Sequence, residues 1–241
     1  MYEYINDDIL KEINETLDWH SGIELPDGRI LGSLTKSKRD KPETIPDRRI
    51  VRLHETLDLN GKSVLEVGCL EGAHTLSFLQ YTDDVTAFDV RPKNVINTLM
   101  RLSVMGKKAN VFVAEAEKVH LRRRFDVMFH CGVFYHLIDP VKYMRNLEMA
   151  AKYILLDTHI AKQEESSVFP LWEERFSGHF IPEGNWESPF AGKDEYAMWL
   201  TEDSLRKLID ESGYDIHEEW EHSTQRNGER ICWLLKSKME S

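Results

Sequence analysis

Apolar and polar positions follow two different periods along this chain, and together they predict alternating strands and helices. Five apolar runs have the length of buried strands: 64–67, 85–89, 111–113, 127–130 and 153–157. Patterns with helical spacing lie between most of these runs, and Pro92 and Pro140 stand where the first turn of a helix tolerates proline. Continuous apolar strands separated by helices predict an α/β fold with a parallel sheet covered by helices on both faces.

The flanking parts of the chain follow other patterns. Residues 1–60 start and end with apolar positions at helical spacing, with a turn-rich part between them. Residues 160–200 are rich in aromatic residues and contain three prolines. We therefore predict a helical N-terminal extension over 1–60 and a main domain over 61–241, in which 160–200 is an insert after the fifth strand.

The last part of the chain predicts one helix and two strands. Thr201 is a good N-cap, acids occupy the first turn after it, and Gly213 marks the end of the helix. Apolar positions then predict strands near 216–220 and 231–235, joined by a hydrophilic connection.

One strand–turn–helix segment has the arrangement of a nucleoside-binding loop. The first strand contains Glu66 and is followed by a turn with Gly68 and Gly72, and then by a helical pattern. Such a turn lets backbone N–H groups approach an adenosine-type cofactor. An acid then belongs at the end of the next strand, about 20 residues later. Asp89 stands there, and its carboxylate can accept hydrogen bonds from both hydroxyls of a ribose.

Composition narrows the class of protein. With 241 residues, 41% of them hydrophobic, and six Trp, the chain can form one large domain with a real core. No stretch approaches the roughly 20 apolar residues of a membrane span, and the acidic start lacks the blocks of a signal peptide. Cys69, Cys131 and Cys232 are far apart and in no metal spacing, which predicts reduced thiols in the cytoplasm.

The charge of the chain argues against general binding of nucleic acid. The formal net charge is −11, whereas phosphate binding depends on clustered Lys and Arg. Basic residues do gather at 36–52 and at 122–124. We interpret both as solvated surface charge, with a local basic face as the alternative.

Several motifs, in this order, resemble the class I S-adenosylmethionine-dependent methyltransferases, which have a Rossmann-like, mostly parallel sheet of seven strands. Residues 66–72 resemble the acid-x-Gly-x-Gly-x-Gly loop of that family, except that Leu70 stands where the middle glycine is expected. A Cβ makes a positive φ costly at this position. Residues 114–117 resemble the stretch that frames the adenine, and 125–140 resemble the motif after the fourth strand. The resemblance covers about residues 60–236.

The resemblance implies S-adenosylmethionine as the cofactor and S-adenosylhomocysteine as the product. The residues expected to contact the cofactor are Glu66, Gly68, Cys69, Gly72, Asp89, Val90, Glu115, Ala116, Cys131 and Gly132. Asp89 is expected to bind the ribose and Glu115, which replaces the usual aspartate, the adenine.

Three residues after the fourth and fifth strands are the candidates for chemistry. Methyl transfer from a sulfonium is an in-line displacement, so the protein must align the nucleophile and exclude water. A base is needed only if the nucleophile loses a proton as it attacks. His136 is the candidate for that base, Tyr135 is expected to line the same pocket, and His159 is a second candidate. A packed loop histidine is the alternative interpretation of His136.

The aromatic insert is the predicted substrate cover, because this fold usually carries one after strand five. Mostly apolar walls with a few polar groups suit a small-molecule pocket, although core filling would explain the same residues. Acceptor contacts are expected from Trp172, Arg175, His179, Trp186 and Tyr196. No metal is expected, because Asp157, His159 and His179 lack the close spacing of a two-His-plus-acid site.

These patterns favour transfer of a methyl group to an oxygen or nitrogen of a small metabolite, by a cytoplasmic monomer or homodimer without membrane contact. Residues 125–140 and the segment from Trp19 to Ile23 are also similar to the tRNA wobble-uridine carboxymethyl and methyl transferases. A tRNA-modifying enzyme is therefore the alternative, and it would need the basic stretch 36–52 to form a continuous face. A non-catalytic S-adenosylmethionine-binding partner protein is the second alternative, which Leu70 permits.

Overall fold

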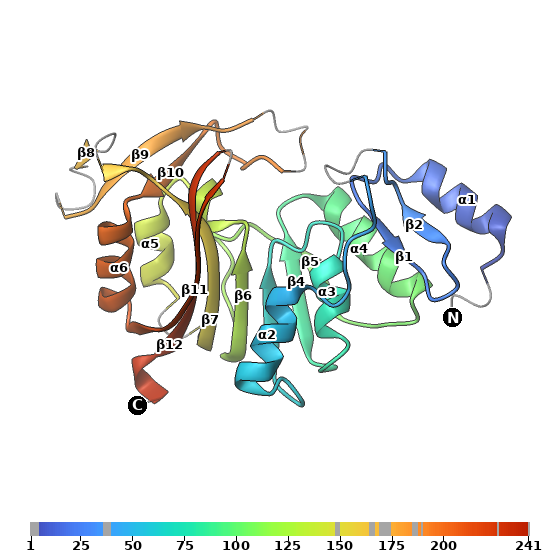
Figure 1. Ribbon diagram of the computed structural model, residues 1–241, viewed down its shortest axis with the longest axis horizontal. Helices are drawn as coiled ribbons and strands as arrows, with labels where there is room; N and C mark the ends of the chain where they lie inside the picture. Colours follow the sequence, from blue (N-terminus) through green and yellow to red (C-terminus); the bar gives the residue numbers. More distant parts are fainter. Residues whose placement is uncertain are drawn as a thin grey trace. The chain divides into compact units, whose positions relative to one another are not determined.

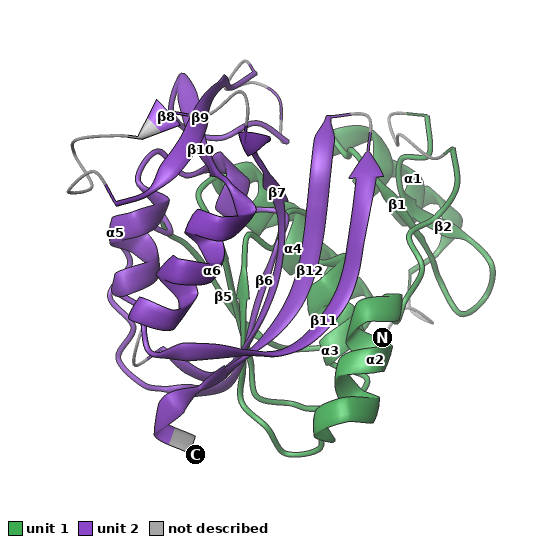
Figure 2. Ribbon diagram, turned by 60° about the vertical axis from the view of Figure 1, so that its left-hand side comes forward, with its two compact units in different colours: residues 1–114 green, residues 115–241 purple. Residues whose placement is uncertain are grey.

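The computed structural model describes residues 5–35, 40–147, 150–163, 167–168, 175–184, 188, 190–225 and 227–240. The chain divides into two compact units, Met1–Ala114 and Glu115–Ser241, which Figure 2 shows in different colours. The predicted boundary near residue 60 stays a prediction.

Seven strands form the main sheet, in the order β11-β12-β7-β6-β3-β4-β5 (Figure 1). The pairs β3–β4, β4–β5 and β6–β7 are parallel, whereas β12 pairs with β7 and with β11 in antiparallel fashion. The sheet is therefore mostly parallel, and with the helices between its strands it confirms the predicted Rossmann-like α/β class.

Unit 1 contains most of the elements predicted for the first half of the chain. Its helices are α1 (Asp7–Thr16), α2 (Arg48–Leu57), α3 (Ala73–Phe78) and α4 (Pro92–Val104), and its strands are β1 (Gly22–Glu24), β2 (Ile30–Gly32), β3 (Val64–Val67), β4 (Val85–Asp89) and β5 (Asn110–Val113). The bounds of β3 and β4 equal the predicted ones. Both are buried along their whole length, as expected for strands covered on both faces of a parallel sheet.

The antiparallel pair β1–β2 is an addition to the prediction, which had only turns in this part of the chain. Three-residue strands are too short to show a period in the sequence. Helix α1 packs against β2, and Asn6 caps α1 by accepting a hydrogen bond from the Ile9 backbone N–H. The helix α4 starts at Pro92 as predicted and packs against β4 and β5.

Unit 2 contains the remaining strands of the main sheet and a second, smaller sheet. Its elements are β6 (Phe125–Cys131), the 3-10 turn η2 (Phe134–His136), α5 (Pro140–Arg145), β7 (Ala151–Ile160), β8 (Ser167–Val168), β9 (Ser177–Pro182), β10 (Tyr196–Leu200), α6 (Glu202–Glu211), β11 (Tyr214–Gln225), β12 (Gly228–Ser237) and the 3-10 turn η5 (Lys238–Glu240). Helices α5 and α6 lie side by side (Figure 1). Thr201 caps α6 as predicted, since its hydroxyl accepts a hydrogen bond from the Ser204 N–H.

The aromatic insert is organised around the small sheet, with strand order β10-β9-β8. The β9–β10 pair is antiparallel and runs from Tyr196 opposite Pro182 to Leu200 opposite Gly178. Strand β10 also contacts η2 and β7. This sheet thereby places the insert next to the segment that follows β6.

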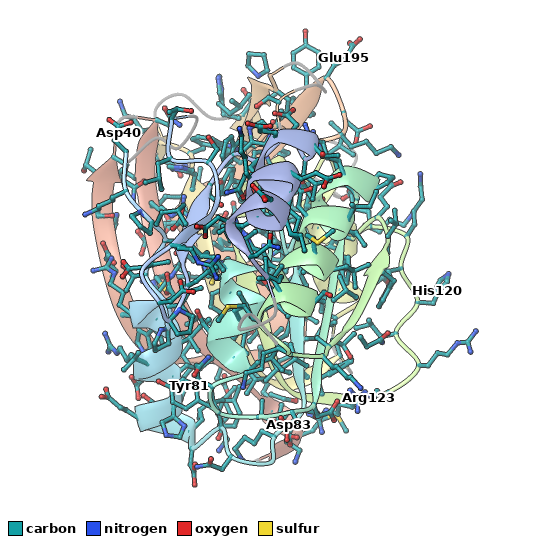
Figure 3. All side chains as sticks on the ribbon, turned by 90° about the vertical axis from the view of Figure 1, so that its right-hand side faces the viewer. Asp40, Tyr81, Asp83, His120, Arg123 and Glu195 are labelled. Carbon is teal, nitrogen blue, oxygen red and sulfur yellow. The ribbon has the colours of Figure 1, made fainter. Side chains whose placement is uncertain are left out.

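Surface features agree with a chain rich in charge. Arg122 and Arg123, in the connection before β6, are exposed, and the Arg123 guanidinium lies over the Phe125 ring, 4.4 Å from its centroid (Figure 3 labels Arg123). None of the helices in the described ranges is long and apolar enough to cross a bilayer.

Candidate cofactor and acceptor sites

The loop after β3 keeps a left-handed backbone at three alternate positions. The φ angles are +76° at Gly68, +47° at Leu70 and +81° at Gly72. A Cβ on Gly72 would come within 2.8 Å of the Thr98 side chain, so that position also needs glycine for space. At Leu70 the same backbone sign carries a Cβ, at a cost of about 1–2 kcal/mol. The loop therefore has the curvature of the glycine-rich pattern although its middle glycine is absent.

Asp89 ends β4 and holds this loop through its carboxylate. Its Oδ2 atom accepts a hydrogen bond from the Leu70 backbone N–H at 3.0 Å. Its Oδ1 atom accepts from the Arg91 N–H at 2.9 Å and from the Asn94 amide at 3.0 Å. Burial raises the pKa of Asp89, and these hydrogen bonds oppose the effect. The acid predicted for a ribose is thus fixed in direction, and the adjacent Val90 is half-buried.

Glu66 is fully buried in β3, and only one of its two carboxylate oxygens accepts a hydrogen bond. Its Oε2 atom accepts a hydrogen bond from the Thr75 hydroxyl at 2.5 Å. Its Oε1 atom has no hydrogen-bond partner and lies 3.7 Å from His74 Nδ1. Burial raises the pKa of Glu66 to about 7. An unpaired buried acceptor below the loop suits a ligand that carries an ammonium group.

Replacing Glu66 with glutamine should remove a pH dependence from the stability of the protein without cofactor. The folded pKa of about 7 lies above the ordinary 4.5, so the folded state retains a proton that the unfolded state loses. The contribution of Glu66 to the free energy of unfolding should be fully present below pH 4.5 and be lost as the pH rises toward about 7, about 3 kcal/mol in total. Urea unfolding of the wild type and of Glu66→Gln across this pH range measures the difference in their free energies of unfolding. A constant difference between them at every pH would contradict the assignment.

A buried ion pair joins the same loop to the N-terminal part of unit 1. The side chains of Glu71 and Arg101 are 1% and 0% exposed, and Arg101 Nη2 lies 3.3 Å from Glu71 Oε2. The Arg101 guanidinium also donates to the backbone carbonyls of Glu71 at 2.8 Å and Ser21 at 2.6 Å. Burial lowers the pKa of Arg101 to about 10, which Glu71 opposes. This pair has no signal in the sequence, because Arg101 lies within an ordinary helical pattern.

Glu71 is the centre of this network. Its two carboxylate oxygens accept hydrogen bonds from the backbone N–H groups of His20 and Ser21, from the Ser21 hydroxyl and from the Asn97 amide. Arg101 also lies over the ring of Trp19, 4.8 Å from its centroid. The Trp19–His20 segment noted in the sequence is therefore attached to the loop. Its signal in the sequence was the spacing of Trp19, His20 and Ile23.

Three further residues predicted to contact the cofactor are Cys69 in unit 1 and Glu115 and Ala116, which follow β5. Cys69 is buried, and burial raises the pKa of its thiol. In unit 2, Glu115 accepts hydrogen bonds from Lys193 Nζ at 2.6 Å and Lys118 Nζ at 3.0 Å. Burial raises the pKa of Glu115, but the two lysines outweigh it and lower the pKa overall. Ala116 is half-buried in the turn that follows.

The end of β6 turns sharply into the predicted chemical segment. Cys131 is buried, and Gly132 has a φ of +83° and donates from its N–H to the Asp157 carbonyl at 3.0 Å. An added Cβ on Gly132 would face the Tyr135 hydroxyl at 3.8 Å and Arg230 Nη2 at 4.0 Å. The glycine is therefore required by its φ and not by lack of space.

Aromatic and charged side chains surround Tyr135 in unit 2. The rings of His159 and Trp199 stack with their centroids 4.8 Å apart, and Tyr135 meets His159 edge-on at 4.8 Å. Arg230 lies over the Tyr135 ring at 5.3 Å and donates from Nε to Asp157 Oδ1 at 2.5 Å. Burial raises the pKa of Tyr135, which Arg230 opposes. Two predicted residues, Tyr135 and His159, thus come together with three that the sequence did not single out as site residues.

The two candidate bases differ in what their ring nitrogens contact. His159 Nδ1 lies 3.1 Å from the Glu229 carbonyl and Nε2 lies 3.4 Å from Arg230 Nη1, so both nitrogens have partners. Burial lowers the pKa of His159. His136 Nδ1 lies 2.8 Å from Glu183 Oε1, and 19% of the His136 side chain is exposed. Glu183 is a further residue that the sequence analysis did not find.

Three of the five residues predicted to contact the acceptor lie within the described part of the chain. Arg175 is exposed and forms an ion pair with Glu211 of α6. His179 is exposed in β9, across the register from Trp199, and the Tyr196 side chain at the start of β10 is 49% exposed. Trp172 and Trp186 lie outside the described residues. The predicted role of all five stays a prediction.

Within the described ranges, no three His, Cys, Asp or Glu side chains gather closely enough to hold a metal ion.

A family model described as "Methyltransferase domain" matches residues 39–219, which is most of the chain. The chain belongs to the methyltransferase-domain family. Its cofactor is S-adenosylmethionine, as the motifs around Gly68, Gly72 and Asp89 implied.

Two curated relatives of this methyltransferase carry different functional names. It is 29% identical over 183 residues to the tRNA U34 carboxymethyltransferase of Idiomarina loihiensis, a match that covers 64% of this chain and 56% of the relative. It is 26% identical over 168 residues to the ubiquinone biosynthesis O-methyltransferase of Nitrosospira multiformis, with coverage of 66% and 65%. The chain thus spans about half to two thirds of the length of these relatives.

Among solved structures, this methyltransferase is similar to the N-terminal domain of EvdMO1 with S-adenosylhomocysteine bound. The TM-score is 0.80 at 20% identity, and the match covers 95% of this chain and 96% of that domain. The same domain crystallised in the presence of S-adenosylhomocysteine and D-fucose gives a TM-score of 0.79 at 20% identity, covering 97% and 98%. At this identity the likeness shows a shared fold along almost the whole chain.

Proposed function

We propose that this protein transfers the methyl group of S-adenosylmethionine to a hydroxyl oxygen of a small polar metabolite, with a nitrogen acceptor as the alternative. The observation that carries the proposal is the group of side chains at the carboxyl ends of β6 and β7: Tyr135, His136, Asp157 and His159, with Arg230. A partly exposed imidazole among aromatic rings and a charged pair is suited to bind a polar molecule and to take its proton.

For the cofactor, unit 1 supplies residues that fit an adenosine with a charged amino-acid tail. The carboxylate of Asp89 is fixed in place by three hydrogen bonds, and of its about four lone-pair sites one, on Oδ2, is left to accept a ribose hydroxyl. The unpaired Oε1 of Glu66 would accept from the ammonium group, directly or through a water. Gly68, Cys69, Gly72 and Val90 belong to the same predicted set in unit 1.

In unit 2 we keep the other predicted cofactor residues. They are Glu115, Ala116, Cys131 and Gly132. Glu115 already accepts from Lys118 and Lys193, so an adenine amino group would share a carboxylate that has two cationic partners. When bound, the cofactor supplies an electrophilic methyl group on a positively charged sulfur.

His136 is the proposed base. A hydroxyl oxygen becomes a better nucleophile as it loses its proton, and an imidazole within reach can accept that proton. His159 is the weaker candidate because both of its ring nitrogens already have partners. Tyr135 and Arg230 would orient the acceptor beside it.

The names of two similar proteins support a hydroxyl acceptor. One relative is called an O-methyltransferase, and the EvdMO1 domain was crystallised with D-fucose present. Both names concern molecules with free hydroxyl groups. We therefore propose polyhydroxylated or phenolic metabolites as the first acceptors to test, and we keep a cytoplasmic location as a prediction.

Release of S-adenosylhomocysteine from S-adenosylmethionine, measured with panels of sugars, phenols and amines, tests the proposal. A hydroxyl compound should give turnover, and His136→Gln should lower kcat about 100-fold or more while the Kd of S-adenosylmethionine stays the same. Turnover only with amines would contradict the hydroxyl acceptor and favour the nitrogen alternative, and an unchanged kcat in His136→Gln would contradict the role of His136. Absence of turnover with every compound of the panels would favour a non-catalytic binding protein.

A tRNA-modifying enzyme is the second candidate, because four of the curated relatives, including one 31% identical over 111 residues from Campylobacter curvus, are named tRNA U34 carboxymethyltransferase. The net charge of −11 opposes it. Part of the required basic stretch, residues 36–39, lies outside the described residues, and Arg49 is engaged by Asp47 and His74. Binding of tRNA that weakens steeply with salt would support this candidate.

A further inference from the structure

The segment that carries the proposed base is held by the insert. Trp199 Nε1 donates to the Tyr135 carbonyl at 2.8 Å, and the Met198 N–H donates to the Leu137 carbonyl at 2.8 Å. Between these two bonds, His136 Nδ1 lies 2.8 Å from Glu183 Oε1. The β9–β10 hairpin therefore fixes the backbone on both sides of His136 and also contacts its imidazole.

Backbone groups of the same connection fix both the side chain and the backbone of Glu183. Its side chain is only 7% exposed, and its Oε2 atom accepts a hydrogen bond from the Gly192 N–H at 2.6 Å. Its own N–H donates to the Glu195 carbonyl at 2.8 Å. A Cβ on Gly192 would come within 3.0 Å of the Glu183 carboxyl carbon and 3.1 Å of the His136 carbonyl. The chain thus approaches the carboxylate as closely as a glycine allows.

This geometry determines which nitrogen of His136 is basic. An ionised carboxylate can only accept a hydrogen bond, so Nδ1 must carry the proton that it donates to Glu183. In the neutral ring Nε2 is then the acceptor. A negative charge beside Nδ1 also stabilises the imidazolium that forms when Nε2 takes a proton. Both effects suit a base.

We propose that Glu183 is a positioning residue that fixes His136 in its Nδ1–H form and directs Nε2 toward the acceptor. The inference rests on the proposed function, in which His136 removes a proton from a hydroxyl. It adds Glu183, a residue of the insert, to the residues that take part in the reaction. The insert would then orient His136 in addition to its predicted role as a substrate cover. No acceptor needs to be known to test it.

Nitrogen-15 NMR of the full chain, labelled at the histidine rings, reports the tautomer directly. The spectrum is taken near pH 8.5, about two units above the ordinary histidine pKa of about 6.5, so that rings are neutral. The resonances of His136 are those lost in His136→Gln. The wild type should show the Nδ1–H form. In Glu183→Leu the ring should change to the Nε2–H form that histidine favours in water, and Glu183→Asp should restore Nδ1–H at least in part.

Glu195→Gln is the matched control, because Glu195 is an exposed acid in the same connection and contacts Glu183 through its backbone only (Figure 3). It should leave the tautomer unchanged, and the Kd of S-adenosylmethionine should change less than about twofold in all four variants. An Nε2–H ring in the wild type would overturn the inference even if Glu183→Leu does not fold. So would an unchanged tautomer in a folded Glu183→Leu.

These outcomes are independent of the acceptor screen. If no hydroxyl compound gives turnover but the wild-type ring is Nδ1–H and responds to Glu183, the proposed function fails and the pairing stands. If turnover is found and the ring is Nε2–H, the reverse is true.

Discussion

Replacing Arg101 with methionine should lower the free energy of unfolding by about 3–5 kcal/mol. The change leaves the carboxylate of Glu71 buried without its positive partner. It also takes away the donor to the carbonyls of Glu71 and Ser21, and a buried acceptor that loses its donor keeps the full cost of leaving water. Chemical unfolding followed by circular dichroism measures the loss.

Two further variants separate charge from packing. A double variant, Arg101→Met with Glu71→Gln, removes both charges and should recover part of the stability, since no unpaired charge is left buried while the carbonyls of Glu71 and Ser21 still lack their donor. Arg29→Met breaks ion pairs with Asp7 and Asp27 that lie in partly or fully exposed positions, and should change stability little. If Arg101→Met were no more harmful than Arg29→Met, the buried pair would not hold the N-terminal segment.

Replacing Asp89 with alanine should weaken binding of S-adenosylmethionine about 10-fold or more. A hydrogen bond from a ribose hydroxyl to the free acceptor site of the carboxylate contributes about 1.5–3 kcal/mol, and the variant loses it. It also releases the N–H of Leu70, whose left-handed backbone depends on that acceptor. Isothermal titration calorimetry with the cofactor measures the effect.

The control is Asp83→Ala, an exposed acid just before β4 (Figure 3). It removes the same charge from the chain and should leave the Kd unchanged, as long-range charge effects are screened in solution. Circular dichroism should show that both variants are folded. A folded Asp89→Ala with wild-type affinity would remove Asp89 from the ribose assignment.

The parts of the fold that the sequence predicted best are those buried on all sides. Strands β3 and β4 have the predicted bounds, because short, mostly apolar runs are typical of strands covered on both faces of a parallel sheet. Strand β11 is longer than predicted. Its side chains alternate between exposed and half-buried, and its register shifts twice against β12, between Ile216 and Glu218 and between Glu219 and Glu221. An exposed, irregular strand carries little periodic signal.

The site was predictable where its residues are neighbours in sequence. Gly68, Gly72 and Asp89 could be found from a strand, a turn and a spacing. Glu71 and Arg101, or His136 and Glu183, could not, because these contacts join residues that are 30 and 47 positions apart. A charged residue in a helix or after a strand has the same pattern in sequence whether it is solvated or buried against a partner.

Leu70 shows that a cofactor loop can keep its left-handed backbone without the glycine that usually occupies this position. The backbone remains left-handed with a leucine in place, and the carboxylate at the end of the following strand anchors that N–H. A search pattern that insists on the middle glycine would pass over this chain. A pattern that allows any residue there, but demands the anchoring acid, would retain it, and would bring in other members of the family whose loops have diverged in the same way.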